Sequence, residues 1–123
     1  MTTKNPNATN PKRGEVWRID FDPTQGSEIN KTRPAIVLSS DGLRSLPVRL
    51  VVPVTAWKSY FESNLWHVQL KPTQRNGLYK SSAADALQVR SVDVARFQNR
   101  MGRVSEQTLE DIVTAVAVVI EYE

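Results

Sequence analysis

At 123 residues the chain is long enough for one domain with its own core, and the absence of cysteine excludes disulfides, thiolate nucleophiles and cysteine-ligated metals. No apolar run approaches the roughly 20 residues that span a bilayer, and the N-terminus lacks the apolar segment of a signal peptide, so we expect a soluble, cytoplasmic protein. All 16 Lys and Arg residues lie within residues 1–105 with 8 of the 13 acidic residues, a balance of +8 that either favours a polyanionic partner or only keeps the protein soluble.

The first half of the chain predicts a tail and then strands. Residues 1–13 are almost entirely polar and predict a disordered tail, followed by a single domain over 14–123. In "GEVWRIDFD" apolar and polar residues alternate, which is the pattern of a half-buried strand. "DPTQGSE" ends this strand and begins a loop that runs to Arg33. The apolar run of "PAIVLSS" predicts a central strand buried on both faces.

The second half predicts further strands and one helix. "VRLVVPVT" predicts a third strand that ends at Thr55, with an edge or bulge near Pro53. "LWHVQL" predicts a fourth strand, "AADALQVRS" a fifth and "NRMGRVS" a short last one, while "VDVARF" predicts a helical turn. After Ser105, a good N-cap, apolar residues recur at helical spacing: Leu109, Ile112, Val113, Val116, Val119 and Ile120. We therefore expect a mainly β fold of the α+β class, a small, strongly curved antiparallel sheet or barrel with a C-terminal helix.

The residue types favour phosphodiester chemistry without a metal over other reactions. One histidine and no cysteine predict no metal site, and no Gly-rich phosphate loop or nucleophile elbow occurs, so we expect no cofactor. RNA carries its own nucleophile, the 2′-OH, so a protein needs to position it, stabilise charge on the phosphate and move protons. Arg33 and Thr55, each at the end of an apolar strand, have suitable donors if the two strand ends are neighbours.

Four segments carry a resemblance to a known family. In order along the chain, "GEVWRIDFDPTQGSE", "TRPAIVLS", "VPVT" and "LQVRSVD" resemble the MazF/PemK (Kid) family of toxin endoribonucleases, from Gly14 to the C-terminal helix. The resemblance implies an SH3-like barrel related to CcdB and MazF, and a homodimer. It implies metal-independent, sequence-specific cleavage of single-stranded mRNA that leaves a 2′,3′-cyclic phosphate and a 5′-OH. It also implies a MazE-like antitoxin whose acidic, disordered segment lies in a basic RNA groove.

The same resemblance assigns catalytic residues. It implies that Arg33 in "TRPAI" and Thr55 in "VPVT" are catalytic, and that Glu28 belongs to a mobile loop and contributes to activity. Several relatives carry an acid directly before the glutamine of "LQVRSVD", where this chain has Leu87. Asp85, which points to the same face of a strand, is a candidate to take over proton transfer.

Further side chains near these positions are candidate RNA contacts: Asn30, Lys31, Trp57, His67, Gln88 and Arg90. Each of these side chains, like the catalytic candidates, also has a purely structural interpretation. Arg33 can pair with Glu28 on the surface, His67 can be a packed strand histidine, and the strand residues can simply cover the sheet.

Two other function classes remain open. One is a non-enzymatic, CcdB-like gyrase inhibitor on a similar fold, which would have no need for Arg33 beside Thr55. The other is an SH3-like RNA-binding module that has lost its activity, for which Leu87 is the only indication. Cleavage of RNA separates the enzyme from both.

Overall fold

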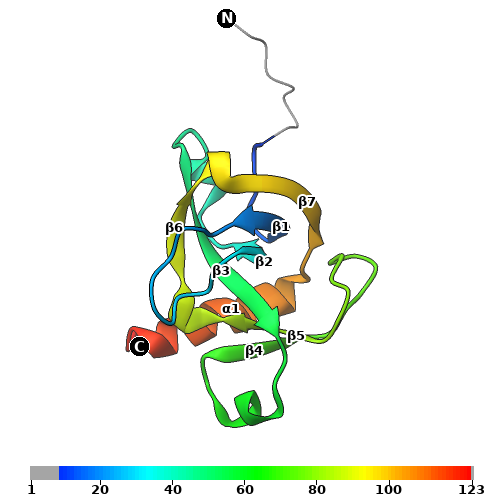
Figure 1. Ribbon diagram of the computed structural model, residues 1–123. Helices are drawn as coiled ribbons and strands as arrows, with labels where there is room; N and C mark the ends of the chain where they lie inside the picture. The colour runs from blue at the N-terminus through cyan, green and yellow to red at the C-terminus, as the bar shows by residue number, and fades with distance from the viewer. Residues whose placement is uncertain (1–8, 123) are drawn as a thin grey trace, which may run out of the picture.

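Seven antiparallel strands and one α-helix build the fold in the computed structural model, which describes residues 9–122 (Figure 1). The strands are β1 (Glu15–Asp20), β2 (Thr32–Val37), β3 (Val48–Ala56), β4 (His67–Leu70), β5 (Ser82–Asp85), β6 (Arg90–Asp93) and β7 (Phe97–Arg103). The helix is α1 (Glu106–Val119), and four short 3-10 turns are η1 (Asp41–Leu43), η2 (Ser59–Ser63), η3 (Ala86–Gln88) and η4 (Val94–Arg96). The expected mainly β class with one C-terminal helix is confirmed.

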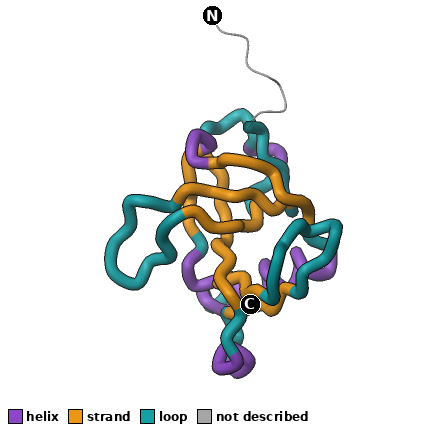
Figure 2. Tube along the Cα trace, turned by 45° about the vertical axis from the view of Figure 1, so that its right-hand side comes forward, coloured by secondary structure: helices purple, strands orange, loops and turns teal. Residues whose placement is uncertain are grey.

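Strand β3 holds the sheet together because its parts pair with different neighbours. The strands follow one another in the order β4-β5-β3-β2-β1-β7, and β6 also pairs with β3. The first part of β3 pairs with β6, its middle pairs with β2, and its end pairs with β5 from Val54 to Ala56. The strands cross in the middle of the molecule with loops and turns around them (Figure 2). The sheet is curved as expected, but the ladder of the described residues stays open between β4 and β7.

Two hydrophobic clusters form because successive strand residues point to opposite faces. One cluster includes Ile36 and Val52 and is covered by α1 through Ile112. The other is built around Phe21 and Val37 on the opposite side of the strands. Neighbouring residues of β2 therefore belong to different clusters, which makes this strand rigid from both sides.

Helix α1 begins where the sequence predicts. The Ser105 hydroxyl accepts a hydrogen bond from the Thr108 amide at 3.1 Å, the expected N-cap contact. Within the predicted apolar stripe Ile112 is buried, whereas Val113 and Ile120 remain 38% and 64% exposed, so the stripe is narrower than predicted. None of the helices in the described residues is long and apolar enough to cross a membrane.

The segment before β1 packs against the fold. Of the expected tail over 1–13, residues 1–8 lie outside the described part, but Pro11 is fully buried. Arg49 holds this segment, because its Nε donates to the Pro11 carbonyl at 2.9 Å and one terminal nitrogen donates to Asn10 Oδ1 at 3.3 Å. Burial lowers the pKa of the Arg49 guanidinium from its ordinary value. The packed chain thus begins before Gly14.

The expected single strand over "AADALQVRS" is wrong, because a turn divides it. The Asp85 carboxylate accepts a hydrogen bond from the Leu87 amide at 3.1 Å, and the chain turns through η3 between β5 and β6. Such a bond from an Asp side chain to a nearby backbone amide competes with a strand ladder. The break leaves Leu87 58% exposed.

The loop of residues 71–81, between β4 and β5, is braced from within by Asn76. This side chain is only 7% exposed. Its Oδ1 accepts hydrogen bonds from the amides of Thr73 and Leu78 at 3.0 Å each, and its Nδ2 donates to the Lys71 carbonyl at 3.0 Å. One buried amide therefore fixes the loop at three points.

Two glycines let this loop lie directly on β7. A methyl group on Gly102 would lie 2.2 Å from the Arg75 carbonyl oxygen, and one on Gly77 would lie 2.2 Å from the Met101 carbonyl oxygen. The Arg103 amide donates to the Arg75 carbonyl at 2.9 Å across the same contact. Any side chain at Gly102 would push the loop away from the sheet.

We expect Gly102→Ala to lower the free energy of unfolding by about 1–3 kcal/mol, the usual cost of overpacking. Chemical denaturation measures the change. Gly42→Ala is the control, because its methyl group would meet only the Ser40 hydroxyl, at 3.3 Å, and we expect a change within about 0.5 kcal/mol. Equal stability of Gly102→Ala and wild type would show that the loop is not docked on β7.

Candidate active site

A hollow of about 230 Å³ brings Arg33 and Thr55 together. The β2–β3 ladder pairs Ala35 with Pro53, and continuing the antiparallel register by two residues sets Arg33 opposite Thr55. The hollow is lined by Arg18, Thr32, Arg33, Pro34, Val54, Thr55, Ala56, Leu78, Tyr79, Lys80, Ser82 and Met101. The two strand ends that the sequence left unconnected are therefore neighbours.

Arg33 is held at its base and free at its tip. It pairs with Ile19 of β1, and Ala35 to Val37, which follow after Pro34, are fully buried. Its Nε donates to the Asn30 carbonyl at 3.2 Å. Among the described residues neither terminal nitrogen of Arg33 has a hydrogen bond. The two ion pairs found there join Arg100 to Glu15 and His67 to Asp85. The guanidinium thus keeps two nitrogens for an anionic ligand.

The loop between β1 and β2 positions Arg33 through its backbone. The Glu28 carboxylate accepts a hydrogen bond from the Gln25 amide at 2.7 Å, so it shapes the loop and does not pair with Arg33. Lys31 has φ +64, in the left-handed region, and its amide donates to Asp22 Oδ1 at 2.8 Å. Its side chain is exposed, beside the Arg33 strand.

Gln88, at the end of η3, holds the same loop through two hydrogen bonds. Its Oε1 accepts from the Ile29 amide at 3.2 Å, and its Nε2 donates to the Ser27 carbonyl at 3.2 Å. Arg90 lies over the ring of the buried Phe21, with its guanidinium carbon 5.6 Å from the ring centroid. Both predicted RNA contacts therefore have structural partners in this state of the loop.

His67 is packed rather than open. Its ring stacks on Phe61 with a centroid distance of 3.7 Å, and its side chain is only 7% exposed. Nδ1 lies 3.1 Å from the Asn64 amide nitrogen, and Nε2 lies 3.5 Å from Asp85 Oδ2. Both ring nitrogens have partners, which favours a positioning role. Trp57 meets the same Phe61 ring edge-on, at 5.8 Å.

Asp85 lies close to the candidate pair. Thr55 pairs with Ala83 in the β3–β5 ladder, and Asp85 follows two residues later on the same face of β5. Diagonal neighbours of this kind are roughly 7–8 Å apart. The Asp85 side chain is 14% exposed and is held by His67 and the Leu87 amide. The β3–β5 register thus places a carboxylate diagonal to Thr55, although Asp85 is not among the residues that line the hollow.

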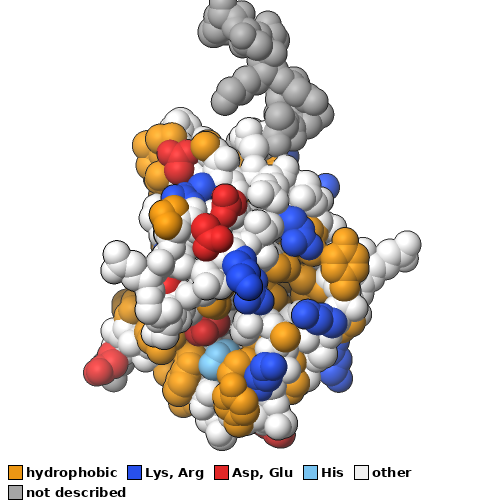
Figure 3. All heavy atoms as spheres, in the orientation of Figure 1, with side chains coloured by type: hydrophobic (Ala, Val, Ile, Leu, Met, Phe, Trp, Pro, Cys, Tyr) orange, Lys and Arg blue, Asp and Glu red, His pale blue; other side chains and the backbone are white. Residues whose placement is uncertain are grey.

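Two cations and one tyrosine of the hollow were not singled out from the sequence: Arg18, Lys80 and Tyr79. Arg18 lies opposite Pro34 in the β1–β2 ladder, and in the sequence it is one of the polar residues that alternate along a half-buried strand. Tyr79 and Lys80 belong to a polar connection that only the docked loop brings to the site. Figure 3 shows Lys and Arg side chains gathered over one face of the molecule, with the single histidine, His67, next to an acidic side chain.

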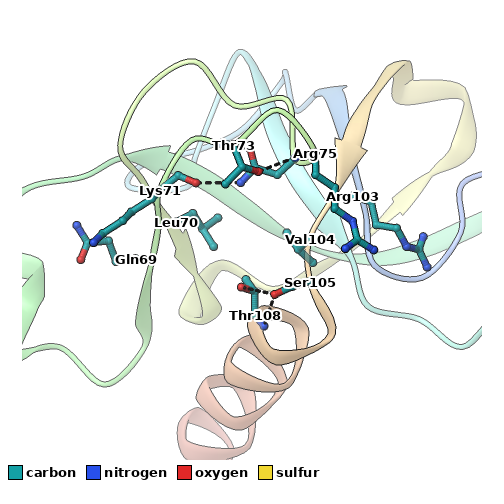
Figure 4. Close-up of a pocket in the computed structure, with 10 residues that line it drawn as sticks. Gln69, Leu70, Lys71, Thr73, Arg75, Arg103, Val104, Ser105 and Thr108 are labelled. Carbon is teal, nitrogen blue, oxygen red and sulfur yellow. Dashed lines mark hydrogen bonds between the residues drawn. The ribbon is translucent and has the colours of Figure 1, made fainter.

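A second, larger hollow of about 440 Å³ lies where the loop 71–81 meets the start of α1 (Figure 4). Its wall includes Lys71, Arg75 and Arg103. Its hydroxyls are already used, because Ser105 Oγ donates to Thr108 Oγ1 at 3.0 Å. None of the predicted catalytic residues lines it, whereas Arg33 and Thr55 both line the smaller hollow, which is therefore the better candidate for catalysis.

Comparison with known proteins gives one consistent result. Residues 12–120 match the family described as the PemK-like, MazF-like toxin of type II toxin–antitoxin systems. The chain is 37% identical over 111 residues to Endoribonuclease MazF9 of Mycobacterium tuberculosis, covering 85% of this chain and 92% of that protein.

Solved structures share the fold. MazF (Form-I) from Deinococcus radiodurans has a TM-score of 0.77 at 22% identity, covering 90% of this chain and 96% of that chain. An endoribonuclease in complex with its cognate antitoxin, from Mycobacterial species, has a TM-score of 0.73 at 19% identity, covering 92% and 97%. At these identities the likeness concerns the fold alone.

We expect Gln88→Leu to release the β1–β2 loop. The substitution removes two hydrogen bonds, each with a net contribution of about 1 kcal/mol. Hydrogen exchange of the Ile29 amide should therefore become roughly 5- to 30-fold faster, as measured by NMR or mass spectrometry. Gln69→Leu, on an exposed position of β4, is the matched control. An unchanged exchange rate at Ile29 in Gln88→Leu would mean that Gln88 does not hold the loop.

Proposed function

The chain belongs to the PemK-like, MazF-like toxin family of type II toxin–antitoxin systems, and on this premise we propose that it is a metal-independent, sequence-specific endoribonuclease. Its substrate is single-stranded RNA, mRNA in the cell. Its products are fragments with a 2′,3′-cyclic phosphate and a 5′-OH. The observation that carries the proposal is the hollow in which Arg33 and Thr55 lie together with further cations.

The reaction begins with the 2′-OH of the nucleotide before the scissile bond. Its proton passes to the Asp85 carboxylate as the oxygen attacks the phosphorus. His67 and the Leu87 amide hold that carboxylate in place, so they act as positioning groups. Asp85 in this role compensates for the missing acid at Leu87.

Arg33 and Thr55 stabilise the charge that develops on the phosphate. The free terminal nitrogens of Arg33 donate to two non-bridging oxygens, a geometry that a guanidinium fork matches well. The Thr55 hydroxyl donates to another phosphate oxygen. Because the strands fix both groups before RNA arrives, little reorganisation is needed in the transition state. The bond to the 5′-oxygen then breaks, and that oxygen takes a proton from water and leaves as a 5′-hydroxyl.

The β1–β2 loop forms the movable wall of the site. Glu28 keeps its shape, Asn30 orients Arg33, and the Lys31 ammonium contacts a flanking phosphate. Gln88 and Arg90 exchange their present partners for RNA when the loop moves. Trp57 and His67 border the groove from the turn and strand beyond β3.

Regulation follows from the charge of the groove. A MazE-like antitoxin with an acidic segment would occupy the hollow and compete with RNA for Arg18, Arg33 and Lys80. We also propose that the chain acts as a homodimer in the cytoplasm, where mRNA and antitoxin are found. The chain has no need of a membrane for this role.

Arg33→Ala and Thr55→Val should each lower kcat for RNA cleavage by roughly 10²–10³-fold, because each removes a donor to the developing charge. Arg33→Lys should remain impaired, because an ammonium group cannot provide two parallel donors. Thr114→Val, on an exposed position of α1, is the control and should cleave like wild type. Normal cleavage by either site variant would remove that residue from the mechanism.

Asp85→Asn should lower kcat by roughly 10²–10⁴-fold, the usual contribution of general acid–base catalysis. The amide still accepts a hydrogen bond from Leu87, so folding should be preserved. Asp111→Asn on α1 is the matched control. If Asp85→Asn cleaves RNA at the wild-type rate, the proton acceptor lies elsewhere.

A further inference from the structure

The loop 71–81 presents an aromatic ring that packing does not explain. Tyr79 is 84% exposed, more than any other large hydrophobic side chain in the described residues. None of the aromatic pairs or hydrogen bonds within that part of the chain involves its ring or hydroxyl. An aromatic side chain usually contributes by burial, so this ring gives the isolated fold little stability.

The backbone that carries the ring is nevertheless fixed on both sides. Leu78, directly before it, is 7% exposed and belongs to the core, and its amide donates to Asn76. On the other side the Trp57 amide donates to the Ser81 carbonyl at 3.1 Å, which ties the loop to the end of β3. The backbone of Tyr79 is therefore at a set position, and a ligand that contacts the ring has to order only the torsions of this one side chain.

The position of this ring is the rim of the candidate active site. Tyr79 and Lys80 line the same hollow as Arg33 and Thr55. Their neighbours include Arg18, so an apolar ring stands among cations. Single-stranded RNA has an anionic backbone and flat bases, and it therefore matches this combination of cations and an aromatic ring.

We propose that the Tyr79 ring stacks on a base next to the scissile phosphate and that Lys80 contacts a neighbouring phosphate. This inference rests on the proposed function, because it assumes RNA in the hollow. Every base has an aromatic face, so the contact adds affinity and orients the strand without reading its sequence. Loop 71–81 is then a fixed wall of the groove, opposite the movable β1–β2 loop.

The main alternative is that the Tyr79 ring contacts a second copy of the chain. A symmetric contact through this surface would place the three cations of one hollow, Arg18, Arg33 and Lys80, near those of the other. Like charges that face each other disfavour the contact between two copies, whereas the same cations attract a polyanion. The charge around Tyr79 therefore favours RNA.

The test is binding of an RNA oligomer that carries a 2′-O-methyl group at a cleavage site mapped with wild type. The blocked 2′-oxygen prevents cleavage, so fluorescence anisotropy gives Kd. We expect Tyr79→Ala to weaken binding by roughly 5- to 100-fold and Tyr79→Phe by less than about threefold. Tyr122→Ala, 75% exposed and outside the hollow, is the matched control and should bind like wild type.

Salt dependence separates stacking from charge. Lys80→Ala should reduce the slope of log Kd against log salt by about 0.7, the value for one phosphate contact to a single strand. Tyr79→Ala should leave the slope unchanged. Thermal unfolding of both variants should match wild type, because both side chains are exposed.

The outcomes distinguish the two proposals. If wild type cuts no RNA, the proposed function fails and the stacking fails with it. If wild type cuts RNA but Tyr79→Ala binds the blocked oligomer as tightly as wild type, only the stacking proposal is overturned. Sedimentation that shows Tyr79→Ala has lost self-association, with RNA affinity per folded dimer unchanged, would assign the ring to a second copy and also overturn it.

Discussion

The pairing of β2 with the middle of β3 is the constraint on which the rest of the site depends. Continued by two residues, its register sets Arg33 opposite Thr55, while the next part of β3 pairs with β5 and brings Asp85 alongside. Both strands are packed from two sides by hydrophobic clusters, so the core holds the strand ends that carry Arg33 and Thr55, while His67 and the Leu87 amide hold Asp85. A reaction that depends on preorganised donors needs this kind of support.

The two walls of the hollow differ in how they are fixed, and this difference matches their proposed roles. The β1–β2 loop is held by a few side-chain contacts, chiefly the Gln88 amide, which a ligand can replace. Loop 71–81 is held by the buried Asn76 and by backbone packed against backbone at Gly77 and Gly102. One wall can therefore adjust to the RNA while the other keeps its place, consistent with a groove that both releases product and selects a strand.

The sequence predicted the class of fold from local patterns: alternation, strand ends and the cap at Ser105. It named Arg33 and Thr55 through the resemblance to a family, and their placement opposite each other follows from the β2–β3 register. It did not predict what depends on distant contacts. The turn at Asp85 was missed because it depends on a hydrogen bond between the Asp85 side chain and the Leu87 amide, and the anchoring of Pro11 by Arg49 joins segments far apart in the chain. Tyr79 looked like part of a polar loop, since nothing in its local sequence shows that the loop docks on β7 beside the hollow.

The most direct test is cleavage of a long single-stranded RNA by the wild-type protein in EDTA, followed by analysis of the fragment ends. We predict cuts at a few recurring sites, fragments with a 5′-OH and a 2′,3′-cyclic phosphate, and no cut where the preceding nucleotide lacks its 2′-OH. RNA that is bound but stays intact, or fragments that carry a 5′-phosphate, would contradict a reaction in which the 2′-OH attacks and Arg33 and Thr55 stabilise the charge.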